Sequence, residues 1–198
     1  FIATFLVPCE HLRYEDTTKV KYVAEYMMRE GIKFKNTDVQ AIITMTQNLD
    51  DMIRLLQRLP EASPAVRLQA GLIVRNVKEL WVTLLIVATV NLTRRKTADT
   101  AVDWCKRSHD WYQTILHDLH LDECWKVKPL MNGQELIKEL GLEKGPQVGL
   151  YNQQQLYWML QYPEGTLQEC KVYLKDFHKK QEFEQDQAAQ HISKKMHL

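Results

Sequence analysis

The sequence LMNGQELIKELGLEKGPQVGLYNQQQLYWMLQYPEGTLQECKVYL, residues 130–174, carries the clearest structural signals in this chain. It predicts three short helices, because residues that start and stop a helix recur along it. Asn132, followed three residues later by Glu135, forms a capping box, in which each side chain accepts a hydrogen bond from the other residue's backbone N–H. Gly141 supplies the left-handed residue that ends the first helix.

The second and third helices of this region follow the same rules. Gly145-Pro146 opens the second helix, with proline at a position where its missing N–H is not needed, and Tyr162-Pro163 stops it. Thr166 with Glu169 repeats the capping box for the third helix. Helical spacing predicts that the following side chains face inward: Leu136, Ile137 and Leu140, then Leu150, Leu156, Tyr157 and Leu160, then Cys170, Tyr173 and Leu174.

The rest of the chain also shows helical periodicity, which predicts an all-α protein without a sheet. Ser63-Pro64 is the clearest helix start outside the first region. The apolar run 80–90 is expected to form a central buried helix, since a bilayer span needs about 20 residues. Helices are expected at residues 20–29, from Asn36 or Thr37 onward, and at 64–75, 77–92 and 99–120, the last with Val102, Cys105, Trp111, Ile115 and Leu116 on its apolar face. The expected domains are a helical body at 1–125, a three-helix tail at 126–177 and a polar C-terminal extension at 178–198.

Composition excludes disorder but does not reveal a partner. The chain has 198 residues, is 45% hydrophobic and has a formal net charge of +1. A net charge this close to zero does not indicate nucleic-acid binding, so binding of a nucleic acid would need basic residues gathered on one face. The four cysteines are scattered without a CxxC pair, which favours reduced thiols in a core and an intracellular location.

Three segments of the chain resemble CCA-adding tRNA nucleotidyltransferases, most of all the plant and fungal enzymes. NGQELIKELGLEKGPQVG, followed by a helix and YPEGTLQEC, resembles their C-terminal tail, and residues 13–39 and 66–86 fit the same family in the same order. The resemblance fails at residues 94–120 and after Phe177. It implies a helical body and tail that hold the backbone of tRNA at its elbow.

The catalytic parts of that family are not found in this sequence. The resemblance places Mg²⁺-binding carboxylates in an N-terminal head, as an Asp-x-Asp pair beside a Gly-Gly pair, and this sequence has neither. Glu15-Asp16-Thr17-Thr18-Lys19 only mimics the Glu-Asp-x-x-Arg signature that reads the nucleotide. We therefore expect no catalytic residues and no cofactor in this chain. Because Phe1 is not an initiator methionine and residues 1–7 look like the end of a helix, we expect a fragment or a processed form.

Metal and nucleophile chemistry have weaker support. His109-Asp110 resembles the metal-binding pair of phosphohydrolases, but no spacing supports a further ligand at His11, Asp118 or Asp122. Cys105 with His109, and His117 with His120, have ligand spacing on one helix. Polar helices show such pairs by chance, so no metal site is expected. Cys105 and Cys124 are better explained by core burial than by nucleophilic catalysis.

The positive signal is for contact with phosphate. The helix opened by Gly145-Pro146 presents free N–H groups and the positive end of its dipole beside Lys144. Lys126 and Lys128 precede the helix capped by Asn132, whose N-terminus is expected to act in the same way. The candidate RNA-binding residues are Lys33, Lys35, Arg75, Lys78, Lys126, Lys128, Lys144 and Gly145.

Two functions remain open. The first is the tRNA-binding body and tail of a CCA-adding enzyme whose catalytic head lies outside this chain. The second is a non-catalytic structural subunit that has kept this fold in a larger, mitochondrial assembly and binds other proteins. A mitochondrial location, or a cytoplasmic or nuclear one, fits the first. A metal-dependent hydrolase using His109 and Asp110 is a distant third.

Overall fold

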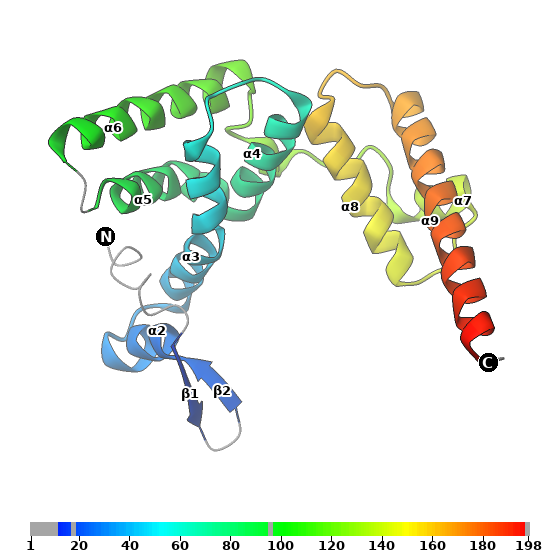
Figure 1. Cartoon of the computed structure of the whole chain (residues 1–198), viewed down its shortest axis with the longest axis horizontal. Helices are drawn as coiled ribbons and strands as arrows, with labels where there is room; N and C mark the ends of the chain where they lie inside the picture. The colour runs from blue at the N-terminus through cyan, green and yellow to red at the C-terminus, as the bar shows by residue number, and fades with distance from the viewer. Residues whose placement is uncertain (1–11, 17–18, 95–96, 197–198) are drawn as a thin grey trace. The chain divides into compact units, whose positions relative to one another are not determined.

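The computed structural model describes residues 12–16, 19–94 and 97–196, and its elements are labelled in Figure 1. The helix end expected at residues 1–7, together with Cys9 and His11, lies outside the described residues. The all-α class is confirmed, with one short exception. The chain divides into two compact units, Phe1–Lys126 and Val127–Leu198, so the division falls one residue beyond the expected end of the body.

The exception is a two-stranded antiparallel hairpin, which corrects the prediction of no sheet. Strands β1 (Arg13–Asp16) and β2 (Lys19–Tyr22) pair in a register that places Arg13 opposite Tyr22. The helix expected at 20–29 begins only with α2 (Val23–Tyr26), which continues as the π-helix η2 (Met27–Gly31). Residues 19–22 alternate polar and apolar side chains, the period of a strand, but over too few residues to stand out in the sequence.

Helix α5 (Trp81–Thr93) is the central element of the first unit, as expected from its apolar composition. It packs against α3 (Asn36–Gln57), α4 (Pro64–Val77) and α6 (Ala98–Gln113). The 3₁₀ turn η3 (Lys78–Leu80) joins α4 to α5, and η5 (Cys124–Lys126) ends the unit. One face of α5 remains outside this packing, because Ile86 and Val90 are exposed.

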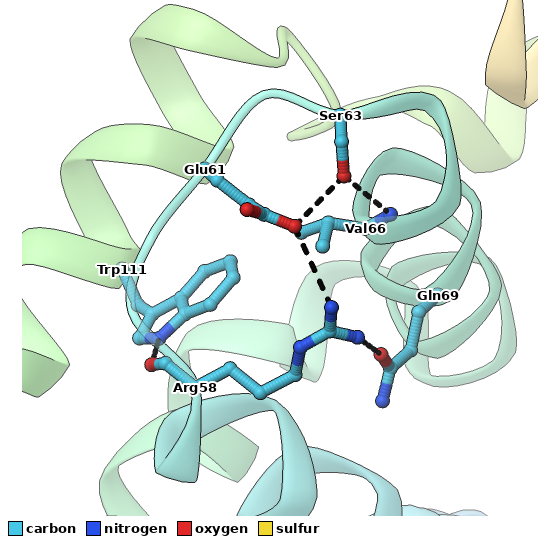
Figure 2. Close-up of polar contacts among 6 residues, drawn as sticks. All are labelled: Arg58, Glu61, Ser63, Val66, Gln69 and Trp111. Atoms are coloured by element: carbon cyan, nitrogen blue, oxygen red, sulfur yellow. Dashed lines mark hydrogen bonds and ion pairs between the residues drawn. The ribbon is translucent and has the colours of Figure 1, made fainter.

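The link between α3 and α4 shows how polar groups fix the corner predicted at Ser63-Pro64 (Figure 2). The Ser63 hydroxyl accepts from the Val66 N–H at 3.4 Å, which confirms Ser63 as the cap of α4. The guanidinium of Arg58 donates to Gln69 at 3.2 Å and lies 3.5 Å from the Glu61 carboxylate. Trp111 on α6 donates its indole N–H to the Arg58 carbonyl at 3.1 Å, so α6 is fastened to the same corner.

Helix α6 differs from its sequence prediction in its face and in its end. Val102 and Cys105 are exposed, whereas Trp111 is fully buried. The helix leaves α geometry after Gln113 and continues as the π-helix η4 (Thr114–Asp118). The buried side chains therefore lie in the second half of the predicted helix. This is the half that contains Trp111, which contacts the link between α3 and α4.

Two helices of the first unit end with the same backbone pattern. At the end of η2 the N–H of Ile32 donates to Met27 O at 2.9 Å, and Lys33 follows with φ of 60°. At the end of η4 the N–H of Leu119 donates to Thr114 O at 2.8 Å, and His120 follows with φ of 48°. A wide π turn closed by a left-handed residue thus ends both helices.

The second unit contains the three helices predicted for residues 130–174. They are α7 (Gly133–Leu140), α8 (Pro146–Gln161) and α9 (Leu167–Met196), and α9 continues through most of the polar C-terminal extension. Both capping boxes are confirmed, and Gly141 ends α7 with φ of 67°. The buried side chains that hold the three helices together are Met131, Leu136, Leu140, Leu142, Tyr151, Trp158, Cys170 and Leu174.

The inward face of α8 matches the prediction only at Leu160, which is buried. Leu150 is exposed and Leu156 and Tyr157 are only half-buried, whereas Tyr151, Gln155 and Trp158 are buried. Gln155 is fully buried because its amide pairs with the backbone before α7: its oxygen accepts from Met131 N at 3.0 Å and its nitrogen donates to Met131 O at 2.8 Å. A glutamine at this position does not look like a core residue in the sequence, so the sequence prediction missed this part of the face.

Candidate nucleic-acid interface

The N-terminus of α7 is closed to a phosphate, contrary to the sequence expectation. Asn132 Oδ1 accepts from the N–H groups of both Gln134 and Glu135 at 3.0 Å. The Glu135 carboxylate accepts from the Asn132 N–H at 2.8 Å. The capping box therefore occupies the N–H groups of Gln134 and Glu135 and places a negative charge beside them, which disfavours a phosphate.

The N-terminus of α8 is different. Gly145 caps the helix without a side-chain hydrogen bond, Pro146 follows, and no described first-turn residue is acidic. Lys144 and Gly145 are both exposed. The partial positive charge of the helix start and the lysine charge thus lie together on the surface, which suits an anion. Gly145 has an extended φ of 170° and open space at its Cβ position, so neither backbone strain nor crowding requires a glycine there.

Lys126 and Lys128 lie on either side of the division between the two units. Both are exposed. The ammonium group of Lys126 pairs with Glu123 and lies 6.0 Å from the centre of the Trp125 ring. An exposed pair of this kind is worth about 0–1 kcal/mol, so a phosphate can replace Glu123 at little cost.

Arg75 has a structural role in the first unit. It is half-buried on α4 and donates to the carbonyl oxygen of Cys124, while Arg67 two turns earlier donates to the carbonyl oxygen of Leu119. The Cys124 thiol donates to Gly71 O at 3.5 Å. These bonds fasten residues 119–126 along α4, and the Arg75 guanidinium is committed at least in part to that task.

The other three candidate lysines lie at element ends in the first unit. Lys35 caps the start of α3 with extended backbone and is exposed. Lys33 and Lys78 are also exposed, and both have a positive φ. Lys78 has φ of 53° and ψ of −133°, a conformation that glycine adopts far more easily than lysine. The sequence gives no sign of this strain.

A cavity of about 510 Å³ lies between the hairpin, α2 and α3. Its walls combine apolar side chains such as Met28 and Ile43 with the carboxylates of Glu25 and Asp50. Arg13 and Tyr22 also line it, and the Arg13 guanidinium lies 5.0 Å from the centre of the Tyr22 ring. Its described lining includes no histidine or cysteine, and its two carboxylates fall short of a group of three metal-ligating side chains.

The thiols and histidines show no catalytic arrangement in the described part of the chain. Burial raises the pKa of Cys124 and of Cys170 to about 11, so both remain thiols at neutral pH. Cys105 is exposed on α6, which corrects the expectation of burial. Among the described residues no group of three histidine, cysteine or carboxylate side chains is placed to hold a metal. No helix in that same part is both long and apolar enough to cross a bilayer.

Sequence comparison relates the chain to enzymes of tRNA maturation. It is 23% identical over 181 residues to the mitochondrial CCA tRNA nucleotidyltransferase of Saccharomyces cerevisiae. The aligned region covers 88% of this chain and 33% of the yeast protein. It is 21% identical over 184 residues to the mitochondrial CCA tRNA nucleotidyltransferase of Candida glabrata. It is 20% identical over 156 residues to tRNA nucleotidyltransferase cca2 of Schizosaccharomyces pombe.

The chain spans about a third of the length of these curated relatives. No protein-family model matches it, and no solved structure does. The similarity nevertheless extends over 88% of the chain in two of these comparisons. The chain is therefore a distant relative of the eukaryotic CCA tRNA nucleotidyltransferases.

Proposed function

We propose that this chain is the tRNA-binding body and tail of a CCA-adding tRNA nucleotidyltransferase, with nucleotidyl transfer performed by a head that the chain does not contain. The observation that carries this proposal is the similarity to CCA enzymes over most of the chain. The order of the three family-like segments supports the C-terminal assignment. The sequence also lacks the Gly-Gly and Asp-x-Asp motifs expected in a head.

The fold suits recognition of tRNA by shape and phosphate. Sequence-specific readers of RNA use base-stacking aromatics on a sheet or loop, whereas backbone recognition needs only donors and positive charge on a surface. Here Lys144 lies beside the uncapped start of α8, and Lys126 and Lys128 lie nearby in sequence, before α7. The buried indoles of Trp81, Trp111 and Trp158 belong to the core and are not stacking platforms.

The strained backbone at Lys78 also supports the proposal. A non-glycine residue at this φ and ψ costs about 1–3 kcal/mol, and such strain clusters at functional sites. Glycine would relieve it, but glycine has no ammonium group. A lysine held at a position better suited to glycine is consistent with a side chain kept for binding.

Binding of the 198-residue chain to an unmodified tRNA, followed by fluorescence anisotropy at several salt concentrations, tests the proposal. Each neutralised phosphate contributes a log–log salt slope of about −0.9. Replacing Lys126, Lys128 and Lys144 together with alanine should therefore make the slope shallower by up to about 2.7 if each contacts one phosphate. The loss should be similar for tRNAs of different sequence, because phosphate contacts do not read bases.

The matched control replaces three other exposed lysines, Lys106, Lys138 and Lys180, with alanine. Both triple variants change the net charge from +1 to −2, so a difference between them reports position and not overall charge. Equal losses in the two variants would reject Lys126, Lys128 and Lys144 as phosphate contacts. No binding of the unaltered chain to tRNA at low salt would reject the tRNA role and favour the structural-subunit function.

A further inference from the structure

A cleft of about 500 Å³ lies in the second unit, where α8 turns into α9. Trp158, Tyr162 and Gly165 are among the residues that line it. The Trp158 and Tyr162 rings lie 5.8 Å apart, tilted by 41°. This volume is in the range of specific ligand sites.

Gly165 keeps the indole close to the backbone. A Cβ atom built on it would lie 2.2 Å from Cη2 and 2.7 Å from Cζ2 of Trp158. Its φ is outside the positive region, so glycine is required here for space and not for a turn conformation. The Trp158 indole therefore lies directly against the turn at residues 162–166. A hydrogen bond from Gly165 N–H to Tyr162 O closes this turn at 3.0 Å.

The rim of the cleft is negatively charged. Glu164 and Glu169 both line it, and no described lining residue is basic. Glu169 is held in place by the capping box, because its Oε2 accepts from the N–H and the hydroxyl of Thr166, both at 2.8 Å. These neutral donors, the backbone N–H foremost, lower the pKa of the Glu169 carboxyl and so keep it ionised. The lining thus carries two negative charges, of which the one on Glu169 is held in place.

Tyr162 is left half in solvent, with 47% of its surface exposed, although it lies against the buried Trp158. Exposed aromatic surface next to carboxylates attracts a planar cation, which stacks on the ring and pairs with a carboxylate at the same time. Phosphate is repelled by the same carboxylates. The chemistry of the cleft therefore differs from that of the start of α8, where positive charge gathers.

We propose that this cleft is a docking site for an arginine side chain of a partner polypeptide, with the guanidinium against Tyr162 and paired to Glu164 and Glu169. An arginine fits better than a lysine, since its fork donates to two carboxylate oxygens and its plane stacks on an aromatic ring. This inference does not rest on tRNA binding. A chain that binds no tRNA keeps the same cleft.

The test titrates Nα-acetyl-arginine N-methylamide into the ¹⁵N-labelled 198-residue chain and follows its two-dimensional amide spectrum. Saturable shifts are expected at the Trp158 indole N–H and the Gly165 amide, with the matching citrulline amide, which is uncharged, binding at least about tenfold more weakly. Glu164→Gln should weaken binding about threefold, as expected for an exposed ion pair. Glu143→Gln makes the same charge change at an exposed position outside the cleft lining and should leave binding unchanged.

Three results would overturn the proposal. The first is the absence of saturable shifts at Trp158 and Gly165. The second is equal binding of the arginine and citrulline amides, since recognition would then ignore charge. The third is a shift of the Trp158 signal on addition of single-stranded RNA without a shift on addition of the arginine amide, which would make the cleft an RNA site.

Discussion

Lys78 is the residue at which stability and the proposed function oppose each other most directly. Its φ and ψ disfavour any side chain with a Cβ, yet its ammonium group is exposed. We predict that Lys78→Gly raises the free energy of unfolding by about 1 kcal/mol, because the relieved strain exceeds the entropy lost by glycine. The same change should weaken tRNA binding and make its salt slope shallower by about 0.9.

Lys78→Ala is the control for this prediction. Alanine removes the charge but keeps the Cβ, so it should weaken tRNA binding as much as glycine does while leaving stability within about 0.5 kcal/mol of the original. Urea unfolding measures the free energy of unfolding, and fluorescence anisotropy measures tRNA binding. If alanine stabilises the chain as much as glycine, the backbone at residue 78 is not strained.

Two glycines near α8 should respond in opposite directions to the same substitution. Gly165→Ala forces a Cβ against the Trp158 ring and should destabilise the chain by about 1–3 kcal/mol through overpacking. Gly149→Ala adds a methyl group within α8, where nothing lies within 4 Å, and should stabilise it by about 0.5–1 kcal/mol. The melting temperatures of the two variants, compared with that of the unaltered chain, test both predicted changes in stability. Stabilisation by Gly165→Ala would show that the indole moves aside freely.

At the scale of whole elements, an ion cluster joins two helices of the second unit. Glu139 on α7 lies 2.7 Å from Lys171 Nζ and 2.6 Å from Lys175 Nζ on α9. Hydrogen bonds from Lys171 and then from Lys175 lower the pKa of the Glu139 carboxyl from 4.5 to about 2. The folded state therefore holds the carboxylate ionised at pH values where the unfolded chain has taken up a proton.

The pH dependence of this cluster follows from the direction of that shift. Its stabilising contribution is complete above about pH 4.5 and is lost as the pH falls towards 2, because protonation removes the charge that pairs with the lysines. Glu139→Gln should lower the melting temperature at pH 7, and the gap to the unaltered chain should narrow steadily below pH 4.5. Glu143→Gln serves as the control. A gap that stays constant with pH would assign the effect to packing.

Helix ends with a cap in the sequence were predictable from adjacent residues, whereas most of the inward face of α8 was not. Asn132 with Glu135, Ser63 with Pro64, and Gly141 each act through bonds or backbone angles within one turn, and all three behave as predicted. The inward face of α8 depends on what covers it. The amide of Gln155 is buried because the Met131 backbone, 24 residues away, supplies its partners, and no local pattern carries that information.

The candidate site was predictable in part for the same reason. The uncapped start of α8 beside Lys144 could be read from Gly145-Pro146. The structural use of Arg75 depends on its bond to the Cys124 carbonyl, 49 residues away, and the strain at Lys78 depends on the corner between α4 and η3. The cleft at Trp158 could not be predicted from the sequence, because Glu169 has the pattern of a capping residue and Glu164 that of a turn residue.

At the scale of the whole molecule, the chain corresponds to about a third of its curated relatives. We predict that the purified 198-residue chain does not add CMP or AMP to a tRNA that lacks its CCA end, because its sequence has no Asp-x-Asp carboxylates to hold Mg²⁺. Incorporation of labelled CTP and ATP is the measurement. Incorporation that persists after repurification, with the mass of the chain confirmed by mass spectrometry, would contradict the proposal that a separate head performs nucleotidyl transfer.

The wide turns that end η2 and η4 also bear on how the length of this chain can vary. A π turn holds one residue more than an α turn, so removing one exposed residue, such as His117, lets Leu119 close an ordinary α-helical bond to Thr114 without moving the buried side chains before it. Single-residue deletions are thus expected to be tolerated at these two places and poorly elsewhere in the helices. Alignment gaps among relatives should collect there, at the ends of helices whose cores stay unchanged.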